Sequence, residues 1–593
     1  MTCRFSRSHL GILVSLLGVF CVYLGVDYPL SPGPQDSCTY YYIAQSNIKY
    51  LTEFLFSDSE QFNPERCAEQ HIVPCAMPVA KPFVFLMQTL YAAILPVGFR
   101  FMAIGQALTA LLISAALLII VTLLYRMVRE QNLTVPDTFP CAVPFLLLFA
   151  LSGSQIYYSM EFTTAFINSL AISLTIACYL SYRSRPSLSR SAIFGLSMSV
   201  AVSSHLSTVF FLLVFPLLEL LDFFLRFRST SWTTRLSRWA IITLCVPVFP
   251  LLTQLVTWIP TLWIEDPSAW KFTAYYGWPY RTYFGQLKSY ADAVQEAFDH
   301  SMSLVSRFTI IGILAVVLEG PILILSATGW IAALSDCFRK GWNIPCALLV
   351  VGPILPLVSY VLARNVFPAP YATTPIGIYF VLLAGYGTVR VFELKTKHFA
   401  SRMLLLAFPL CVILLQVIHL SPMVRQPGAY LALHDWLEEQ GEHRVVVLGR
   451  QGLTEAAGID TYGFEGNQHL QEISETGNPQ LGAWGLRPAL EWDDPDLPRY
   501  LALTDVRWLP DRTYDDKFIQ FHQVDLANPT QRFPEFSITY YYAEYYALYA
   551  GLRCFFQPSL TEEKARNVKA LRDRYERDSL FVYEIPRRTN PGE

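Results

Sequence analysis

Asp36 is the residue in this chain whose type and position most directly suggest chemistry. It lies about ten residues after the first apolar segment, and a run of tyrosines that begins at Tyr40 follows it. A positioned carboxylate can act as a general base toward a hydroxyl or amine acceptor. An acid where a membrane helix meets a long loop therefore suggests a reaction at the membrane face, on a substrate carried by lipid.

Further polar residues fall near the ends of predicted membrane segments, on the same side as Asp36. They are Tyr40, Lys81, Arg100, Glu161, His205 and Arg364. Each has an ordinary structural explanation, such as a cation at lipid headgroups, a charge at a helix end or a satisfied polar group in a bundle. As a set they supply an acidic pair and several cations, and guanidinium groups suit a phosphate leaving group. The opposite face shows only runs of arginine.

A metal ion is neither required nor excluded by these residues. Asp36 and Glu161 are the hard oxygen ligands of the set, so a divalent cation, where one is used, would bind there. Inverting glycosyl transfer needs only one base, and one indispensable aspartate is enough for it.

The composition of the chain is that of a multi-span membrane protein. Its 593 residues are 53% hydrophobic and only 15% charged, against about 25% charged in an ordinary soluble protein. The mean hydropathy is +0.34, and long apolar runs occupy roughly the first 420 residues. The net charge of −3 gives no basic field for nucleic acid.

Lys and Arg gather in short cytoplasmic loops, and this rule predicts eleven spans with the N-terminus in the cytoplasm. The predicted spans are 11–26, 101–125, 139–159, 163–181, 191–204, 207–225, 239–260, 308–334, 343–363, 371–391 and 401–420. The scheme leaves the loop 27–100 and the tail 421–593 outside. It also keeps the glycosylation sequon at Asn132 inside and unmodified.

The apolar segment from Phe83 to Pro96 is an exception to this scheme. As a helix it reaches only about 21 Å, short of a hydrocarbon core of about 30 Å. We therefore predict an interfacial or re-entrant helix on the outer face. In the same loop, Cys67 and Cys75 could form a disulfide in an oxidising compartment, and a Cys/His zinc site with His71 is the less favoured alternative.

The composition changes from about Arg425, which divides the chain into a transmembrane domain, 1–424, and a soluble domain, 425–593. Alternating periodicities predict helices at 429–440 and 564–577 and strands at 444–449, 504–509 and 580–584. This pattern indicates a small α/β domain without a Gly-rich phosphate loop. The tyrosine run 540–546 could line a sugar site, although packing against the membrane domain explains it better.

Several short motifs resemble the GT-C superfamily of polyprenyl-phosphate-sugar-dependent glycosyltransferases. They are Asp36 with Tyr40, Lys81-Pro82, Arg100, the segment from Tyr157 to Glu161, and Arg364 with Pro368, Pro370, Tyr371 and Pro375. The resemblance is strongest over the first 210 residues, toward protein O-mannosyltransferases and the enzymes that add aminoarabinose to lipid A. The chain departs from the family at Ser37, where members often have Glu, and at Phe83, where they often have a second Pro.

The resemblance implies a polytopic α-helical enzyme with a C-terminal soluble domain. Asp36 would be the catalytic carboxylate, Glu161 the second acid, and Lys81, Arg100 and Arg364 the ligands of the lipid phosphate. A polyprenyl-phosphate sugar would be the donor, and a lipid, glycan or protein the acceptor. The bacterial inner membrane is the favoured location and the endoplasmic reticulum the alternative. A flippase for a lipid-linked glycan and a non-catalytic assembly subunit are the competing functions.

Overall fold

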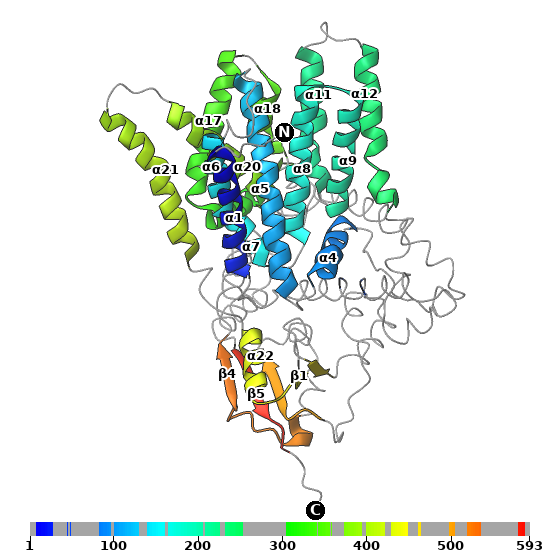
Figure 1. Cartoon of the computed structure of the whole chain (residues 1–593), viewed down its shortest axis with the longest axis vertical. Coiled ribbons are helices and arrows are strands. Elements are labelled where there is room, and N and C mark those ends of the chain that lie inside the picture. The colour runs from blue at the N-terminus through cyan, green and yellow to red at the C-terminus, as the bar shows by residue number, and fades with distance from the viewer. Residues whose placement is uncertain are drawn as a thin grey trace, which may run out of the picture.

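The protein is described by a computed structural model. The residues that it describes are 7–27, 44, 48, 82–95, 100–129, 139–160, 164–205, 208–225, 232–252, 304–340, 342–355, 357–358, 373–393, 399–421, 429–448, 460–463, 497–504, 519–534 and 579–586. These residues form a bundle of helices and, beyond it, a smaller domain built on a β-sheet (Figure 1).

The bundle consists of long apolar helices, and every predicted span overlaps at least one of them. Its elements are α1 (Arg7–Asp27), α4 (Pro82–Ile94), α5 (Arg100–Arg129), α6 (Phe139–Ala150), α7 (Gly153–Met160), α8 (Thr164–Ser184), α9 (Leu188–Ser204), α10 (Thr208–Leu212), α11 (Val214–Leu225), α12 (Trp232–Cys245), α16 (Leu304–Glu319), α17 (Ile322–Lys340), α18 (Ile344–Val351), α20 (Thr373–Glu393) and α21 (Phe399–Leu420). Among the described helices, seven are long and apolar enough to cross a membrane. The predicted polytopic helical fold is therefore confirmed.

The helices pack around a buried apolar core and leave large apolar side chains on the outside of the bundle. Leu404 on α21 and Phe224 on α11 are each 71% exposed, as expected for side chains that face lipid rather than water. Glycines allow α17 and α20 to approach closely, because a Cβ atom at Gly329 would lie 1.7 Å from the Leu383 carbonyl oxygen. Such close contact through small residues is typical of helix pairs in membranes.

The third predicted span, 139–159, is not one continuous helix. It divides at Leu151 and Ser152 into α6 and α7. Ser152 precedes the first turn of α7, and its carbonyl accepts the first hydrogen bond of that helix, from the Ile156 amide at 2.9 Å. Serine and glycine favour such a helix start, and the sequence Ser152-Gly153 supplies both.

The eighth predicted span, 308–334, also divides in the structure. α16 ends at Glu319, Gly320 adopts a φ of +34°, and α17 begins after Pro321. Glycine tolerates the positive φ at a helix end, and proline has no amide hydrogen with which to continue a helix. The two helix breaks lie against each other, since a Cβ atom at Gly153 would lie 1.9 Å from the Leu318 carbonyl oxygen.

The C-terminal domain contains a five-stranded mixed sheet with the order β2-β1-β3-β5-β4. Its elements are α22 (Ala429–Glu439), β1 (Arg444–Leu448), β2 (Asp460–Gly463), β3 (Tyr500–Thr504), β4 (Gln531–Pro534) and β5 (Ser579–Glu584). β1 runs parallel to β2 and β3, whereas β5 pairs antiparallel with β3 and β4. α22 covers one face through Leu433 and Leu437.

The predicted soluble α/β domain is confirmed in kind. The structure places a strand at 500–504, where Leu501 and Ala502 are buried, and of the strand predicted at 504–509 only Thr504 lies within the described residues. The predicted helix 564–577, the tyrosine run 540–546 and the boundary after residue 424 lie outside the described residues.

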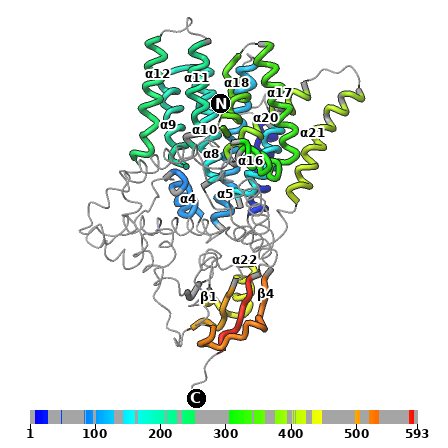
Figure 2. Tube along the Cα trace, turned by 180° about the vertical axis from the view of Figure 1, so that it is seen from behind, coloured from blue at the N-terminus to red at the C-terminus, as the bar shows by residue number. Residues whose placement is uncertain are grey.

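The two ends of the bundle differ in character. The sheet domain lies beyond the end at which α1 and α21 finish and α5 begins (Figures 1 and 2). We call this the sheet end and the opposite one the basic end, because α5, α8, α17 and α20 finish there (Figure 1) and carry Arg126, Arg183, Arg339 and Arg390 near their C-terminal ends. α4, which has 13 residues and a length of about 20 Å, lies at the sheet end.

We predict that the two ends lie on opposite sides of the membrane. Single cysteines introduced as Asn132→Cys and Pro427→Cys, after the native cysteines have been replaced, should react with an impermeant reagent from opposite sides. In the sequence, Asn132 follows α5, which finishes at the basic end, and Pro427 follows α21, which finishes at the sheet end. Labelling of both cysteines from the same side would contradict the predicted number of membrane crossings between them.

Candidate functional site

The sheet end of the bundle gathers the ends of the helices that flank the predicted site residues. α4 begins directly after Lys81, α5 begins at Arg100, α7 ends directly before Glu161, and α9 ends directly before His205. Figure 1 shows these helix ends on the side of the sheet domain. The residues Asp36, Tyr40, Lys81, Glu161 and Arg364 themselves lie outside the described residues, so their assignment stays a prediction.

His205 lies in a turn that is fixed to α8. It is half-buried and extended, and its carbonyl accepts a hydrogen bond from the Thr208 amide at 2.9 Å. Asn168 on α8 accepts hydrogen bonds from Ser204 Oγ at 2.6 Å and from Thr208 Oγ1 at 2.8 Å. One buried amide side chain therefore holds both sides of the turn that carries His205.

A second carboxylate, Asp27, lies at the sheet end and was not predicted as a site residue. It is the last residue of α1 and only 6% exposed. Its Oδ1 accepts a hydrogen bond from Ser159 Oγ at 2.9 Å, and its buried Oδ2 has no hydrogen-bond partner within the described part of the chain. An ionisable group buried among membrane helices is expensive and commonly functional, so Asp27 joins the candidate site.

Glu319 is another buried acid, and it binds the first turn of α7. It accepts hydrogen bonds from Ser152 Oγ at 2.9 Å, from the Ser154 amide at 3.0 Å, from the Gly153 amide at 3.3 Å and from Ser154 Oγ. The first amides of a helix lack partners within the helix, and the helix dipole favours a negative charge at that point. The acid at the end of α16 therefore caps α7.

The carbonyl groups at the two helix breaks are bonded by side chains of other helices. Tyr23 of α1 donates to the Phe149 carbonyl at 3.1 Å, and Gln416 of α21 donates to the Leu151 carbonyl at 3.0 Å. His419 Nε2 lies 2.8 Å from the Val317 carbonyl. We call Tyr23, Glu319, Gln416 and His419, with the backbone that they bind, the break cluster.

Across the described ranges, no three His, Cys, Asp or Glu side chains are grouped as a metal site. The acids Asp27 and Glu319 are each bonded to serines rather than to one another. The oxygen ligands considered for a divalent cation, Asp36 and Glu161, lie outside these ranges, so the question of a metal is not decided.

The chain is similar in structure to a protein whose structure has been solved. The crystal structure of ArnT from Cupriavidus metallidurans in the apo state superposes with a TM-score of 0.50 and 13% sequence identity, over 84% of this chain and 93% of that chain. The chain shares the fold of this ArnT.

A second crystal structure, of the same ArnT bound to undecaprenyl phosphate, gives a TM-score of 0.47 and 11% identity, over 84% of this chain and 94% of that chain. No protein-family model matches the chain, and no curated protein matches it either. The similarity therefore rests on structure, and at such low identity it establishes the fold shared with ArnT and not the reaction.

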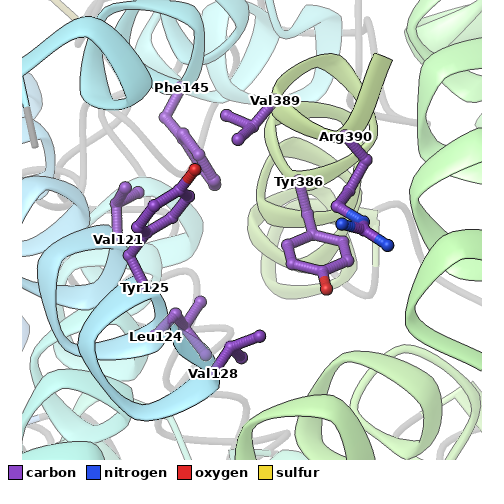
Figure 3. Close-up of a pocket in the computed structure, with 8 residues that line it drawn as sticks. All are labelled: Val121, Leu124, Tyr125, Val128, Phe145, Tyr386, Val389 and Arg390. Atoms are coloured by element: carbon purple, nitrogen blue, oxygen red, sulfur yellow. The ribbon is translucent and has the colours of Figure 1, made fainter. Parts of the chain in front are cut away.

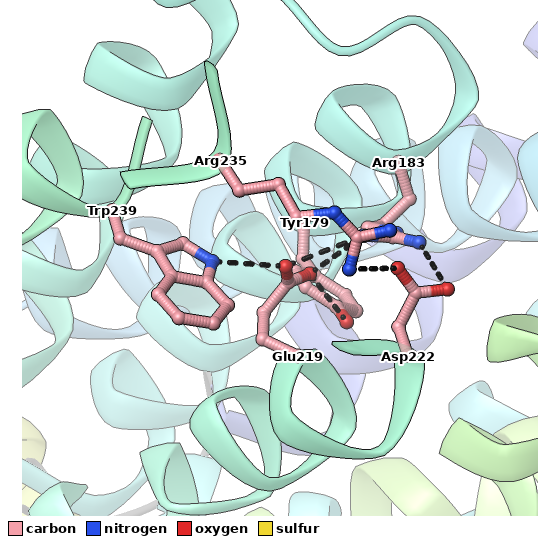
Figure 4. Close-up of polar contacts among 6 residues, drawn as sticks. All are labelled: Tyr179, Arg183, Glu219, Asp222, Arg235 and Trp239. Atoms are coloured by element: carbon pink, nitrogen blue, oxygen red, sulfur yellow. Dashed lines mark hydrogen bonds and ion pairs between the residues drawn. The ribbon is translucent and has the colours of Figure 1, made fainter. Parts of the chain in front are cut away.

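The basic end of the bundle carries a buried ion cluster, whereas we predicted only runs of arginine on this face. Arg183 binds Glu219 at 3.1 Å and Asp222 at 2.9 Å. Arg235 approaches Asp222 at 3.9 Å, while Tyr179 and Trp239 donate to Glu219. Figure 4 shows these side chains converging from α8, α11 and α12. The cluster balances its charges internally, which is the pattern of a structural link between helices.

A small pocket also lies near the basic end. Its lining comes from α5, α6 and α20 and comprises Val121, Leu124, Tyr125, Val128, Phe145, Tyr386, Val389 and Arg390 (Figure 3). Tyr386 and Arg390 both bind the buried Asp336, the latter at 3.0 Å. The pocket is mostly apolar and lies at the other end of the bundle from the predicted site residues, so it has no part in the candidate site.

The sequence contained signals for the groups that we did not predict. Glu319 precedes Gly320-Pro321, a pair that interrupts helices strongly, and Ser152-Gly153-Ser154 is a typical helix start. Gln416 and His419 are isolated polar residues in an otherwise apolar span. A search for helix-breaking residues within the predicted spans would have found the two breaks. A further search for isolated polar residues in the other spans would have found their partners in the break cluster.

We predict that Arg183→Met lowers the free energy of unfolding by about 3–5 kcal/mol, because it leaves the Glu219 and Asp222 carboxylates without their main partner inside the bundle. The measurement is thermal unfolding of the purified protein in detergent. Arg185→Met removes the same charge from an exposed position two residues away and should leave the melting temperature nearly unchanged. Equal melting temperatures for the two variants would contradict a structural role for the cluster.

Proposed function

We propose that this chain is an integral membrane glycosyltransferase. It transfers a sugar, with inversion, from a polyprenyl-phosphate donor to a lipid, glycan or protein acceptor at the extracytoplasmic face of the membrane. The observation that carries this proposal is the fold shared with ArnT over 84% of the chain, together with the helix ends that flank the predicted acids and cations at one end of the bundle. Undecaprenyl phosphate, which is bound in the second ArnT structure, is a reasonable lipid to test as the donor carrier.

The residues of the sheet end divide into those that act on the acceptor and those that hold the donor. Asp36 removes or orients the proton of the attacking acceptor group, as a positioned carboxylate can. Lys81, Arg100 and Arg364 bind the phosphate, which leaves as the glycosidic bond to the lipid breaks. Glu161, Tyr40 and His205 bind the substrates, and the C-terminal domain covers the site or recognises the acceptor.

The location follows from the same arrangement. We place the basic end in the cytoplasm because Lys and Arg favour that side. The sheet end and the C-terminal domain then lie outside, in the periplasm if the membrane is a bacterial inner membrane. The endoplasmic reticulum is the alternative, with the site in the lumen.

One observation favours a second function, a flippase or transporter for a lipid-linked glycan. Paired broken helices and an acid within the bundle, as at Glu319, are features of secondary transporters. The two functions differ in what they release. A flippase moves a fluorescent lipid-linked glycan across the membrane of a vesicle without releasing polyprenyl phosphate. A transferase releases polyprenyl phosphate when acceptor is present.

Asp36→Asn should abolish transfer, with a loss on the order of 100- to 10,000-fold in kcat, because the amide cannot accept a proton. The purified protein is supplied with a panel of labelled undecaprenyl-phosphate sugars as donors and with membrane extract as the source of acceptor. The measurement is the release of undecaprenyl phosphate. Asp58→Asn, a change of the same kind elsewhere in the first loop, is the matched control and should retain activity. Full activity of Asp36→Asn would refute the assignment of the base.

We expect Arg100→Gln to weaken binding of undecaprenyl phosphate about tenfold or more, because it removes a charge-assisted hydrogen bond to the phosphate. The dissociation constant can be measured by titration of the purified protein in detergent. Arg126→Gln removes the same charge from the other end of α5 and should not change the affinity. Equal affinities for wild type and Arg100→Gln would exclude Arg100 from the phosphate site.

A further inference from the structure

The short helix α7 is held at both of its ends by buried acids. At its start, Glu319 accepts hydrogen bonds from Ser152, Gly153 and Ser154. In its last turn, Ser159 Oγ donates to Asp27 Oδ1 at 2.9 Å. The helix has 8 residues, a length of about 12 Å, so a shift at one end is transmitted to the other.

The packing around the first turn of α7 leaves little room for such a shift. A Cβ atom at Gly153 would lie 1.9 Å from the Leu318 carbonyl oxygen, and one at Gly377 of α20 would lie 2.3 Å from Ser154 Oγ. α16 and α20 therefore enclose this turn on two sides. The glycines permit the close approach, and Glu319 supplies the polar contacts within it.

The far end of α7 leads into the candidate site. Glu161 follows the last residue of α7 directly, and Asp27 precedes Asp36 by nine positions. The Ser159–Asp27 hydrogen bond thus joins the ends of α7 and α1, the two helices that precede the predicted acids in the sequence. Where α7 sits along its own axis determines where these two helix ends meet.

We propose that Glu319 is a positioning residue of the glycosyltransferase. By fixing the first turn of α7, it sets the place at which the other end of α7, directly before Glu161 in the sequence, meets the Asp27 end of α1. Glu319 acts through α7 and does not touch the substrate. This inference rests on the proposed function.

The carboxylate form of Glu319 is what the geometry uses. Its two oxygens accept from two backbone amides and two serine hydroxyls. In Glu319→Gln one acceptor oxygen becomes an NH₂ donor, which cannot accept from the Gly153 or Ser154 amide. The first turn of α7 must then move or lose a partner, while the volume of the side chain hardly changes.

The test compares Glu319→Gln with Asp336→Asn, which alters a buried acid with two partners at the basic end of the bundle. For each purified protein, kcat and the donor KM are measured with the undecaprenyl-phosphate sugar that the wild type uses, and undecaprenyl phosphate binding is titrated. Hydrogen exchange of residues 153–160 reports the state of α7. Ser154→Ala, which removes one of the donors to Glu319, is a milder second variant for the case that Glu319→Gln does not fold.

For Glu319→Gln we expect kcat to fall on the order of 10- to 100-fold, since small misplacements of reacting groups have effects of this size. Undecaprenyl phosphate affinity should stay within about twofold of wild type, and α7 should exchange faster. Asp336→Asn should lower the melting temperature without changing kcat, and Ser154→Ala should lower kcat less than Glu319→Gln.

A folded Glu319→Gln or Ser154→Ala protein with wild-type kcat overturns the inference and leaves the proposed function intact. An equal loss of kcat in Asp336→Asn also overturns it, because the effect would then be a general loss of structure. A wild-type protein that neither binds undecaprenyl phosphate nor transfers sugar refutes the proposed function itself.

Discussion

The structure depends on one constraint, which is that backbone groups freed inside an apolar bundle must find hydrogen-bond partners within the protein. The breaks after α6 and after α16 each release amides or carbonyls that lipid cannot satisfy. The partners come from three helices: Tyr23 on α1, Glu319 at the end of α16, and Gln416 and His419 on α21. The breaks are stable because these residues converge on them, and the same residues tie α1, α6, α7, α16 and α21 into one unit.

The acids of the bundle also need partners within the protein, and these partners differ between the basic end, the helix breaks and the sheet end. At the basic end, Glu219, Asp222 and Asp336 are bonded to arginines, so each charge is compensated where it lies. At the break, the Glu319 carboxylate is bonded to amides and hydroxyls at a helix start. Among the acids of the described residues, only Asp27, at the sheet end, keeps a buried oxygen without a hydrogen-bond partner. The acid with an unsatisfied oxygen therefore lies at the end of the bundle where the sequence places the candidate site.

Much of the fold could be predicted from hydropathy, and the reason for the failures is physical. Long apolar runs and arginine-rich loops located the helices, since length and charge suffice for that. The breaks at Ser152 and Gly320 were missed because a few helix-breaking residues within a long apolar run lower its mean hydropathy only slightly. Strand β3 begins at Tyr500, before the segment predicted at 504–509, because the alternation of apolar residues does not mark where a strand starts. For the site, Asp36 and Arg100 were chosen by motif, whereas Asp27 and Glu319 show their partners only when distant helices are brought together.

The arrangement fits the reaction centre that we propose, whose predicted residues lie largely between the helices of the bundle. Loops supply acids and cations but do not hold their own geometry. Here the helices next to those loops end at fixed places: α9 and α10 are joined through Asn168, and α1 and α7 through Ser159. Breaking the third span into α6 and α7 gives the Glu161 segment its own short helix, whose placement Glu319 can set independently of α6. A continuous helix would have tied the position of Glu161 to the packing of the whole span, so the break separates the placement of the site from the stability of the bundle.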